Sequence, residues 1–216
     1  MKILIFAPHN DDEVLGAGGT LSRFADQGND VFVCEVTSGE NKVIVDKIKS
    51  EALKAHAIIG VKQTFFLDLP VVAINQVPVS EINEKMLEIV KIVDPEIAFI
   101  PHKGDIHTDH VEVAKSAMVA LRPVSAPNLK AIYAYETLSE TEWNIPSVEN
   151  VFIPNVWSDI SNYLDIKLQA MNCYQTQIKE FPHPRSLEAI EALAKYRGSN
   201  ICVKYAESFM LIRSLL

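Results

Sequence analysis

The sequence is poor in the residues that build a disulfide framework. It has only three cysteines, Cys34, Cys173 and Cys202, which lie far apart among apolar neighbours. An odd, scattered set argues against disulfide pairing and against a CxxC metal knuckle. We therefore expect a reduced, cytoplasmic setting.

Long apolar runs are also lacking. The opening segment, MKILIFAP, has too few consecutive apolar residues for a secretory signal. No stretch approaches the roughly 18 apolar residues that a membrane span needs. We expect no cleaved leader and no insertion into a membrane.

Positive charge is scarce. The chain carries 28 acidic and 20 basic side chains, a formal net charge of −8. This negative charge argues against binding to nucleic acids or to anionic membrane surfaces, because both attract positively charged partners. A small molecule is the expected partner.

Short β-type runs, such as KILIFA, DVFVCEVT and EIAFIP, alternate with amphipathic segments of helical length. This alternation predicts an α/β fold with a Rossmann-like, mostly parallel sheet and helices on both faces. We expect the last third to be helical, over residues 158–178 and 186–215. With 216 residues, 48% of them hydrophobic, the chain can bury one sizeable core, so we expect a single domain over residues 1–216.

A cluster of polar residues follows the first predicted strand. His9, Asp11, Asp12 and Glu13 come directly after KILIFAP, and the carboxyl ends of strands are where α/β sheets bind ligands. A capped helix N-terminus is the alternative, but one cap does not need three consecutive acids. The following GAGG fits neither a dinucleotide fingerprint nor a P-loop. We interpret these glycines as small residues that let the helix approach the sheet.

A second cluster, HKGDIHTDH, follows the buried run EIAFIP. His107 and His110 lie three residues apart, on one face of a helix that begins near Thr108. Imidazoles together with carboxylates are the usual ligands of a catalytic zinc, which keeps three protein ligands and one open position. An exposed polar loop is the alternative for one such motif. Two of them at strand ends favour a metal site.

The two motifs, APHNDDEVLGAGGT and GDIHTDH, resemble the signature of the PIG-L or LmbE-type zinc-dependent de-N-acetylases. Asn10 stands where the family usually has proline, a position to which we assign no chemistry. The segments IYAYETLSETEW and PHPRSLEAIEALAKYRGS are similar to a branch of the family associated with surface-sugar biosynthesis. The resemblance covers essentially the whole chain.

The resemblance implies the roles of five residues: zinc ligands His9, Asp12 and His110, general base Asp11, and second catalytic group His107. Ferrous iron is the alternative metal, because the same ligands can hold it.

Five further candidates come from their positions in the sequence. Asp109 is either a carboxylate that fixes a histidine tautomer in the catalytic site or an acid at a helix N-terminus. Asp105 either shapes the loop or contacts substrate. Arg185, in FPHPRS, either binds a phosphate or carboxylate of the substrate or belongs to an exposed connector. Glu136 and Trp143 either contact a sugar or pack locally.

The expected function is zinc-dependent hydrolysis of an N-acetyl group on an amino sugar, an N-acetylglucosamine-type glycoconjugate or nucleotide sugar. Metal-activated water would attack, with an aspartate as the base. One alternative is an amide or ester hydrolase acting on a non-sugar small molecule. The other is a non-catalytic, metal-containing sugar-binding protein, against which the intact Asp11 argues. The resemblance also allows a homo-oligomer.

Overall fold

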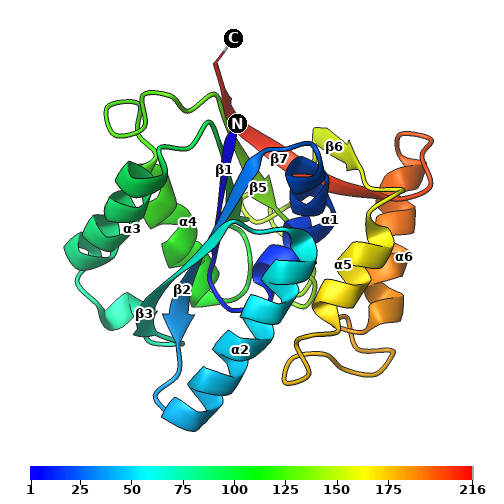
Figure 1. Ribbon diagram of the computed structural model, residues 1–216, viewed down its shortest axis with the longest axis horizontal. Helices are drawn as coiled ribbons and strands as arrows, with labels where there is room; N and C mark the ends of the chain where they lie inside the picture. Colours follow the sequence, from blue (N-terminus) through cyan, green and yellow to red (C-terminus); the bar gives the residue numbers. More distant parts are fainter. Residues whose placement is uncertain (216) are drawn as a thin grey trace.

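The computed structural model describes residues 1–215. Seven strands form one sheet, in the order β3-β2-β1-β4-β5-β7-β6 (Figure 1). The strands are β1 (Lys2–Ala7), β2 (Asp30–Ser38), β3 (Gln63–Pro70), β4 (Ile97–Pro101), β5 (Ala131–Tyr135), β6 (Val156–Asp159) and β7 (Ala206–Ser214). The helices are α1 (Asp12–Asp26), α2 (Lys42–Ile59), α3 (Val79–Val93), α4 (Thr108–Ala120), α5 (Leu164–Met171) and α6 (Leu187–Ser199), with a short 3₁₀ helix, η1 (Ile74–Gln76).

Strands β1 to β5 are parallel, as the sequence predicts. The chain runs outward from β1 to β2 and β3, and then returns to place β4 on the other side of β1. Strand order therefore reverses between β1 and β4. In open α/β sheets, the crevice at the carboxyl ends of two such strands is the usual ligand site.

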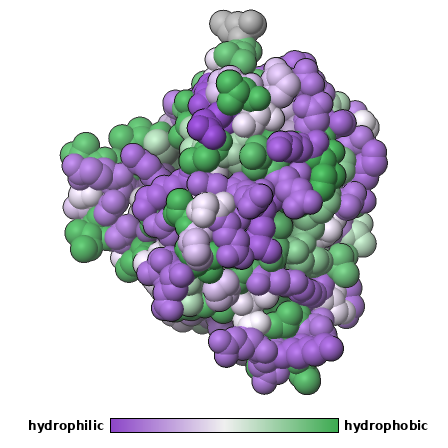
Figure 2. Space-filling model, turned by 90° about the vertical axis from the view of Figure 1, so that its left-hand side faces the viewer, coloured by the Kyte–Doolittle hydropathy of each residue, from purple (hydrophilic) through white to green (hydrophobic). Residues whose placement is uncertain are grey.

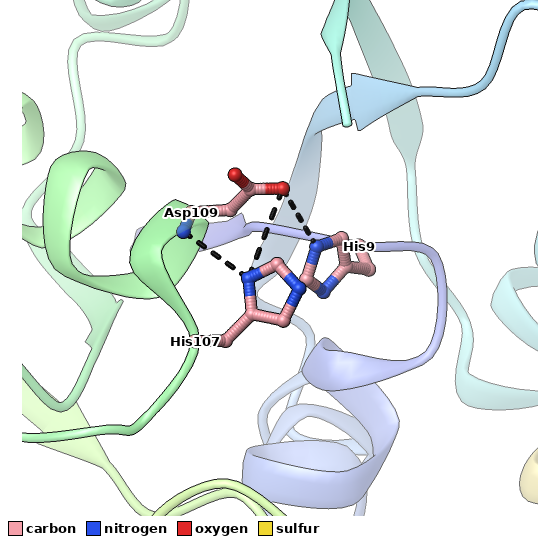
Figure 3. Close-up of side chains that lie close together, drawn as sticks. All are labelled: His9, His107 and Asp109. Atoms are coloured by element: carbon pink, nitrogen blue, oxygen red, sulfur yellow. Dashed lines mark hydrogen bonds and ion pairs between the residues drawn. The ribbon is translucent and has the colours of Figure 1, made fainter. Parts of the chain in front are cut away.

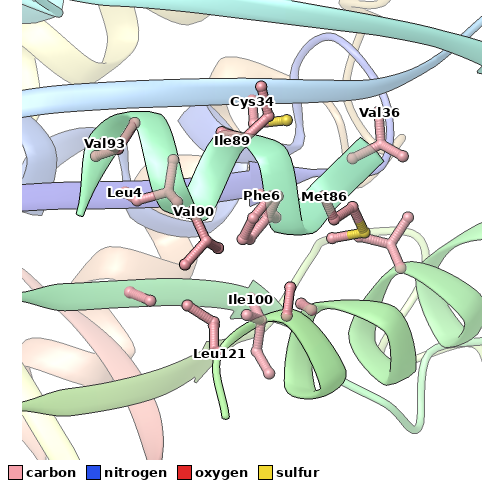
Figure 4. Close-up of a cluster of buried hydrophobic side chains, with 14 of the residues drawn as sticks. Leu4, Phe6, Cys34, Val36, Met86, Ile89, Val90, Val93, Ile100 and Leu121 are labelled. Carbon is pink, nitrogen blue, oxygen red and sulfur yellow. The ribbon is translucent and has the colours of Figure 1, made fainter. Parts of the chain in front are cut away.

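Helices cover both faces of the sheet, as predicted. Alternate side chains of β1 point to opposite faces: Leu4 and Phe6 pack with α3 and α4, whereas Ile3 and Ile5 pack with α1, α2, α5 and α6. Figure 4 shows the first of these two cores. On the side of the molecule that carries α3 and α4, hydrophilic residues predominate and hydrophobic ones are scattered among them (Figure 2).

The glycines of α1 permit a close approach, as we expected. A Cβ atom at Gly16 would lie 2.2 Å from the Tyr135 ring, and one at Gly19 would lie 2.9 Å from Ile160. Neither position has room for a side chain. The helix that follows the first polar motif is thereby held close to the sheet.

The prediction for the C-terminal part was wrong in two respects. Of residues 158–178, expected to be helical, only Leu164–Met171 form a helix, and residues 158–159 belong to strand β6. Helix α6 ends at Ser199, and residues 206–214, which we expected to be helical, form strand β7. This strand pairs antiparallel with β5 and β6. Periodicity cannot distinguish a strand from a helix in a short apolar run, and here pairing with β5 decides the outcome. None of the helices within residues 1–215 combines the length and the apolar character that a membrane span requires.

A buried ion pair joins β7 to α1 and α5. Glu207 accepts hydrogen bonds from the backbone amides of Gly19 (2.9 Å) and Thr20 (2.7 Å), and its Oε1 lies 2.6 Å from Lys167 Nζ. Lys167 also donates to the carbonyl oxygen of Leu15 at 2.8 Å. Both charged side chains are at most 5% exposed. The pair therefore ties three elements together behind the first motif.

The substitution Glu207→Ala is expected to lower the free energy of unfolding by about 3–5 kcal/mol, because it leaves the Lys167 ammonium buried without its counter-charge. Urea denaturation measures the change. The control is Asp30→Ala, which removes an exposed pair with Lys62 and should cost less than about 1 kcal/mol. Equal effects of the two substitutions would contradict a special role for the buried pair.

Candidate metal centre

Three candidate donor atoms converge where β1 and β4 end. His9 lies in the loop after β1, Asp12 is the first residue of α1, and His110 lies in the first turn of α4. His9 Nδ1 is 3.2 Å from Asp12 Oδ2, His110 Nε2 is 3.1 Å from the same oxygen, and the two nitrogens are 3.4 Å apart. The structure thus brings together the three residues that the family resemblance proposed as ligands.

The donor set fits a zinc ion. Tetrahedral zinc with bonds of about 2.0–2.2 Å places its ligand atoms about 3.3–3.5 Å apart, close to the separations of these three atoms. The second carboxylate oxygen of Asp12 is buried and has no hydrogen-bond partner among the described residues. Two imidazoles and one carboxylate also leave one position of a tetrahedral ion open, as catalytic zinc sites do.

Each imidazole has a carboxylate on its other nitrogen. His9 Nε2 donates to Asp109 Oδ2 at 3.0 Å, and His110 Nδ1 donates to Asp105 Oδ2 at 2.8 Å. Asp109 also accepts the amide of Val72 (2.8 Å). Carboxylates in this position fix the tautomer of a ligating histidine and raise its basicity. Asp105 and Asp109 therefore orient the nitrogens that face Asp12.

The electrostatics of the centre favour positive charge. Although burial opposes protonation, hydrogen bonds with Asp109 and Asp12 raise the pKa of His9 to about 9. Burial also lowers the pKa of His110, but Asp12 and Asp105 outweigh this effect and raise the pKa to about 10. Burial disfavours the charged form of Asp12, yet His110 and His9 hold its pKa well below the usual range. The same carboxylates that attract protons here would attract a metal cation.

A second set of donors, His9, His107 and Asp109, also lies close together (Figure 3). In that set, His107 Nδ1 accepts the backbone amide of Asp109 at 3.1 Å, so His107 caps α4 and its Nδ1 lone pair is occupied. Nδ1 is 3.9 Å from Asp109 Oδ2, which already accepts two hydrogen bonds. The set that contains Asp12 and His110 is therefore the better candidate.

His107 stands beside the candidate centre. Its ring lies edge-on to His9, with 4.5 Å between the ring centroids. Burial and the neighbouring His9 lower the pKa of His107 to about 4. With Nδ1 acting as an acceptor, the proton of the neutral ring lies on Nε2. His107 can therefore donate a hydrogen bond from Nε2.

Asp11 occupies the N-cap position of α1 in a conformation that L-residues rarely adopt, with φ 152° and ψ −20°. Its Oδ2 accepts a hydrogen bond from Arg185 Nη1 at 2.9 Å, whereas its Oδ1 is buried and has no partner in residues 1–215. Burial raises the pKa of Asp11 to about 7, against the opposing effect of the Arg185 charge. One carboxylate oxygen is thus held by an arginine and the other is left available.

A cavity of about 390 Å³ borders the centre, and His9, His107 and Arg185 are in its wall. Glu136 and Trp143 are not. Glu136 forms an ion pair with Arg197, Nε to Oε1 at 2.8 Å, and borders a separate cavity. Trp143 is 53% exposed, and its ring lies 6.0 Å from His183. The two predicted sugar contacts thus lie outside the wall of the metal-centre cavity.

Two polar residues are among the parts of the cavity wall that sequence reasoning missed. Glu140 pairs with Arg185 through Nη2 at 3.1 Å. Asn10, to which we assigned no chemistry, has a buried side-chain nitrogen with no partner among the described residues. The sequence could have indicated Asn10, because this residue lies inside the first motif, between His9 and Asp11. Glu140 lies in IYAYETLSETEW, the segment that the family resemblance singled out, but nothing in that segment indicated a partner for its carboxylate.

A buried polar network lies beneath Asp11. Glu13 Oε2 accepts the amide of Asp11 at 3.2 Å, and Glu13 Oε1 accepts hydrogen bonds from His56 Nε2 (3.1 Å) and from the Tyr174 hydroxyl. His56 also bonds to Thr64 Oγ1 at 2.7 Å. The third acid of the first motif thus supports the backbone of Asp11 and is not part of the cavity wall.

Together, the fold and the site define an open α/β protein with a candidate metal centre at its topological switch point. Comparison with known proteins then identifies the family. Residues 4–121 match the PIG-L family, described as GlcNAc-PI de-N-acetylase. Because the match spans more than half of the chain, the protein belongs to the PIG-L family and is a hydrolytic enzyme of the deacetylase type.

Individual relatives are similar over most of their length. The chain is 25% identical to diacetylchitobiose deacetylase of Thermococcus kodakarensis, over 98% of this chain and 83% of the relative. It is 26% identical to probable N-acetyl-alpha-D-glucosaminyl L-malate deacetylase 2 of Bacillus cereus, over 81% of this chain and 83% of the relative. Among solved structures, the conserved protein TT1542 from Thermus thermophilus matches with a TM-score of 0.80 and 27% identity, over 100% and 96% of the two chains. The predicted family and fold class are confirmed.

Proposed function

We propose that the protein is a zinc-dependent deacetylase that removes the N-acetyl group of an amino sugar. The observation that carries the proposal is the convergence of His9 Nδ1, Asp12 Oδ2 and His110 Nε2 beside a buried carboxylate, Asp11, that has a free oxygen. Relatives named as deacetylases of diacetylchitobiose and of an N-acetylglucosaminyl malate support an amino-sugar substrate. We further propose that residues 1–216 act as one catalytic domain.

His9, Asp12 and His110 would hold the metal. Bound zinc would supply a Lewis acid that polarises the acetyl carbonyl and lowers the pKa of a water molecule. Asp11 accepts the proton of the attacking water through its unpartnered oxygen, while Arg185 fixes the other oxygen, and Asp11 then passes this proton to the amine nitrogen as the C–N bond breaks. His107 donates from Nε2 to the negative charge that develops on the carbonyl oxygen. Asp105 and Asp109 hold the two imidazoles in the required tautomers. The cytoplasmic setting and a homo-oligomer remain predictions.

Metal analysis combined with acetate release tests the proposal. We expect one equivalent of zinc per chain, and release of acetate from N-acetylglucosamine and diacetylchitobiose that falls at least about 100-fold after chelation. Adding zinc or ferrous iron back to the metal-free protein identifies the metal that restores more activity. Acetate release that is indifferent to chelation would contradict the metal assignment. Metal without release from any acetylated amino sugar would favour a non-sugar amide or a binding protein.

A further inference from the structure

We infer that the substrate is an uncharged glycoside of the amino sugar, carrying an apolar group next to the sugar. This inference rests on the proposed function and specifies its substrate class. Two features of the 390 Å³ cavity carry it: aliphatic side chains in its wall, and a single permanent cation among the described residues of its lining, already paired with two carboxylates.

Aliphatic side chains build one wall of the cavity. Ile44 and Ile48 lie four residues apart on α2, and so on one face of that helix, and Val71 joins them from the segment after β3. Ile44 is 52% exposed although it borders the cavity. An exposed aliphatic side chain gains from contact with an apolar group of a ligand, because that contact removes both surfaces from water. A free monosaccharide offers little such surface.

The charge of the cavity disfavours an anionic substrate. Among the described residues of its wall, Arg185 is the only one with a permanent positive charge. Its guanidinium is already engaged: Nη1 with Asp11, Nη2 with Glu140 at 3.1 Å, and Nε with the Ser139 hydroxyl at 2.9 Å. A phosphate or carboxylate that bound the two remaining N–H groups of Arg185 would lie beside the carboxylates of Asp11 and Glu140, whose charge opposes it. The sequence led us to expect such a group at Arg185, and the contacts of this side chain argue against that role.

The polar part of the wall suits a neutral sugar. Asn10, Ser38 and Gln177 offer amide and hydroxyl groups, and the side-chain nitrogen of Asn10 has no partner within the described chain. Such groups exchange hydrogen bonds with sugar hydroxyls without requiring a charge on the ligand. The wall of the cavity thus offers both polar groups for sugar hydroxyls and aliphatic side chains for an apolar group.

Acetate release from a matched panel tests the inference. The panel is N-acetylglucosamine, its octyl glycoside below the micellar concentration, its 1-phosphate and its uridine diphosphate derivative. We expect kcat/KM for the octyl glycoside to exceed that for the free sugar by about tenfold or more, and both anionic sugars to fall below the free sugar. Ile44→Ser should remove most of the octyl advantage and leave the free sugar within about twofold. The control is Val43→Ser, which alters the preceding, 79% exposed residue outside the cavity wall and should change neither rate.

The outcomes separate the two proposals. Release from the free sugar with no octyl advantage, or with faster turnover of the anionic sugars, would overturn the inference and leave the deacetylase assignment intact. An octyl advantage that survives Ile44→Ser would overturn the assigned wall. No release from any member of the panel would overturn the proposed function and the inference together.

Discussion

Replacing Asp11 with asparagine is expected to lower kcat by about 10²–10⁴-fold while the protein keeps its zinc. General base catalysis typically contributes a factor of this size, and an amide cannot accept the proton of the attacking water. Asparagine has the same shape as aspartate and can still accept the Arg185 hydrogen bond through its oxygen. The loss should therefore appear in kcat, with little change in KM, in steady-state assays on enzyme of verified zinc content.

The matched control for Asp11 is Glu140→Gln, since Glu140 is the other carboxylate that pairs with Arg185. If Asp11 acts only by holding Arg185, the two substitutions should have similar effects. We expect Glu140→Gln to stay within about tenfold of the unaltered enzyme, because it removes no proton acceptor from the reaction. Full activity of Asp11→Asn at normal zinc content would refute the base assignment.

The parts of the site that sequence could predict are those set by local position. His9 and His110 each follow a strand of a parallel sheet, so the rule that ligands bind at the carboxyl ends of strands applies to both. Their meeting depends on β1 and β4 being neighbours, which the reversal of strand order provides. The βαβ rhythm indicates such a sheet, and the two motifs then mark where its crevice lies.

Partners that are distant in the sequence could not be predicted. Asp109 lies between two histidines of its own motif, yet its carboxylate accepts from His9, 100 residues away. Arg185 meets Asp11 across 174 residues, on a loop whose path no local pattern determines. The prediction for β7 failed for a related reason. The conformation of this strand depends on its pairing with β5 and not on its own periodicity. Such contacts arise from tertiary packing, which overrides local preference.

The contacts of Arg185 link the electrostatics of the site to its specificity. The guanidinium opposes the effect of burial on Asp11 and so favours the charged form that a base requires. We therefore propose that Arg185 positions the base and that neutral groups of the cavity wall recognise the substrate.

Replacing His110 with alanine is expected to remove zinc from the protein and abolish deacetylation. The change eliminates one of three candidate ligands and leaves the Asp105 carboxylate buried without its imidazole partner. Loss of a partner outside the ligand set typically weakens metal binding about 10–100-fold, so loss of a ligand should exceed the upper end of that range. Zinc affinity is measured by competition with a chromophoric chelator, and circular dichroism checks that the variant is folded.

The decisive control is His107→Ala, three residues earlier. His107 belongs to the rival donor set with His9 and Asp109, whereas His110 belongs to the set with His9 and Asp12. If His9, Asp12 and His110 hold the metal, His107→Ala keeps its zinc and loses activity through the missing Nε2 donor, whereas His110→Ala loses both zinc and activity. His107→Ala also removes the side-chain cap of α4, so zinc retained by this variant would show that damage to the helix terminus does not by itself release the metal. Zinc lost from His107→Ala and retained by His110→Ala would instead place the metal between His9, His107 and Asp109, and Asp12 would no longer be a ligand.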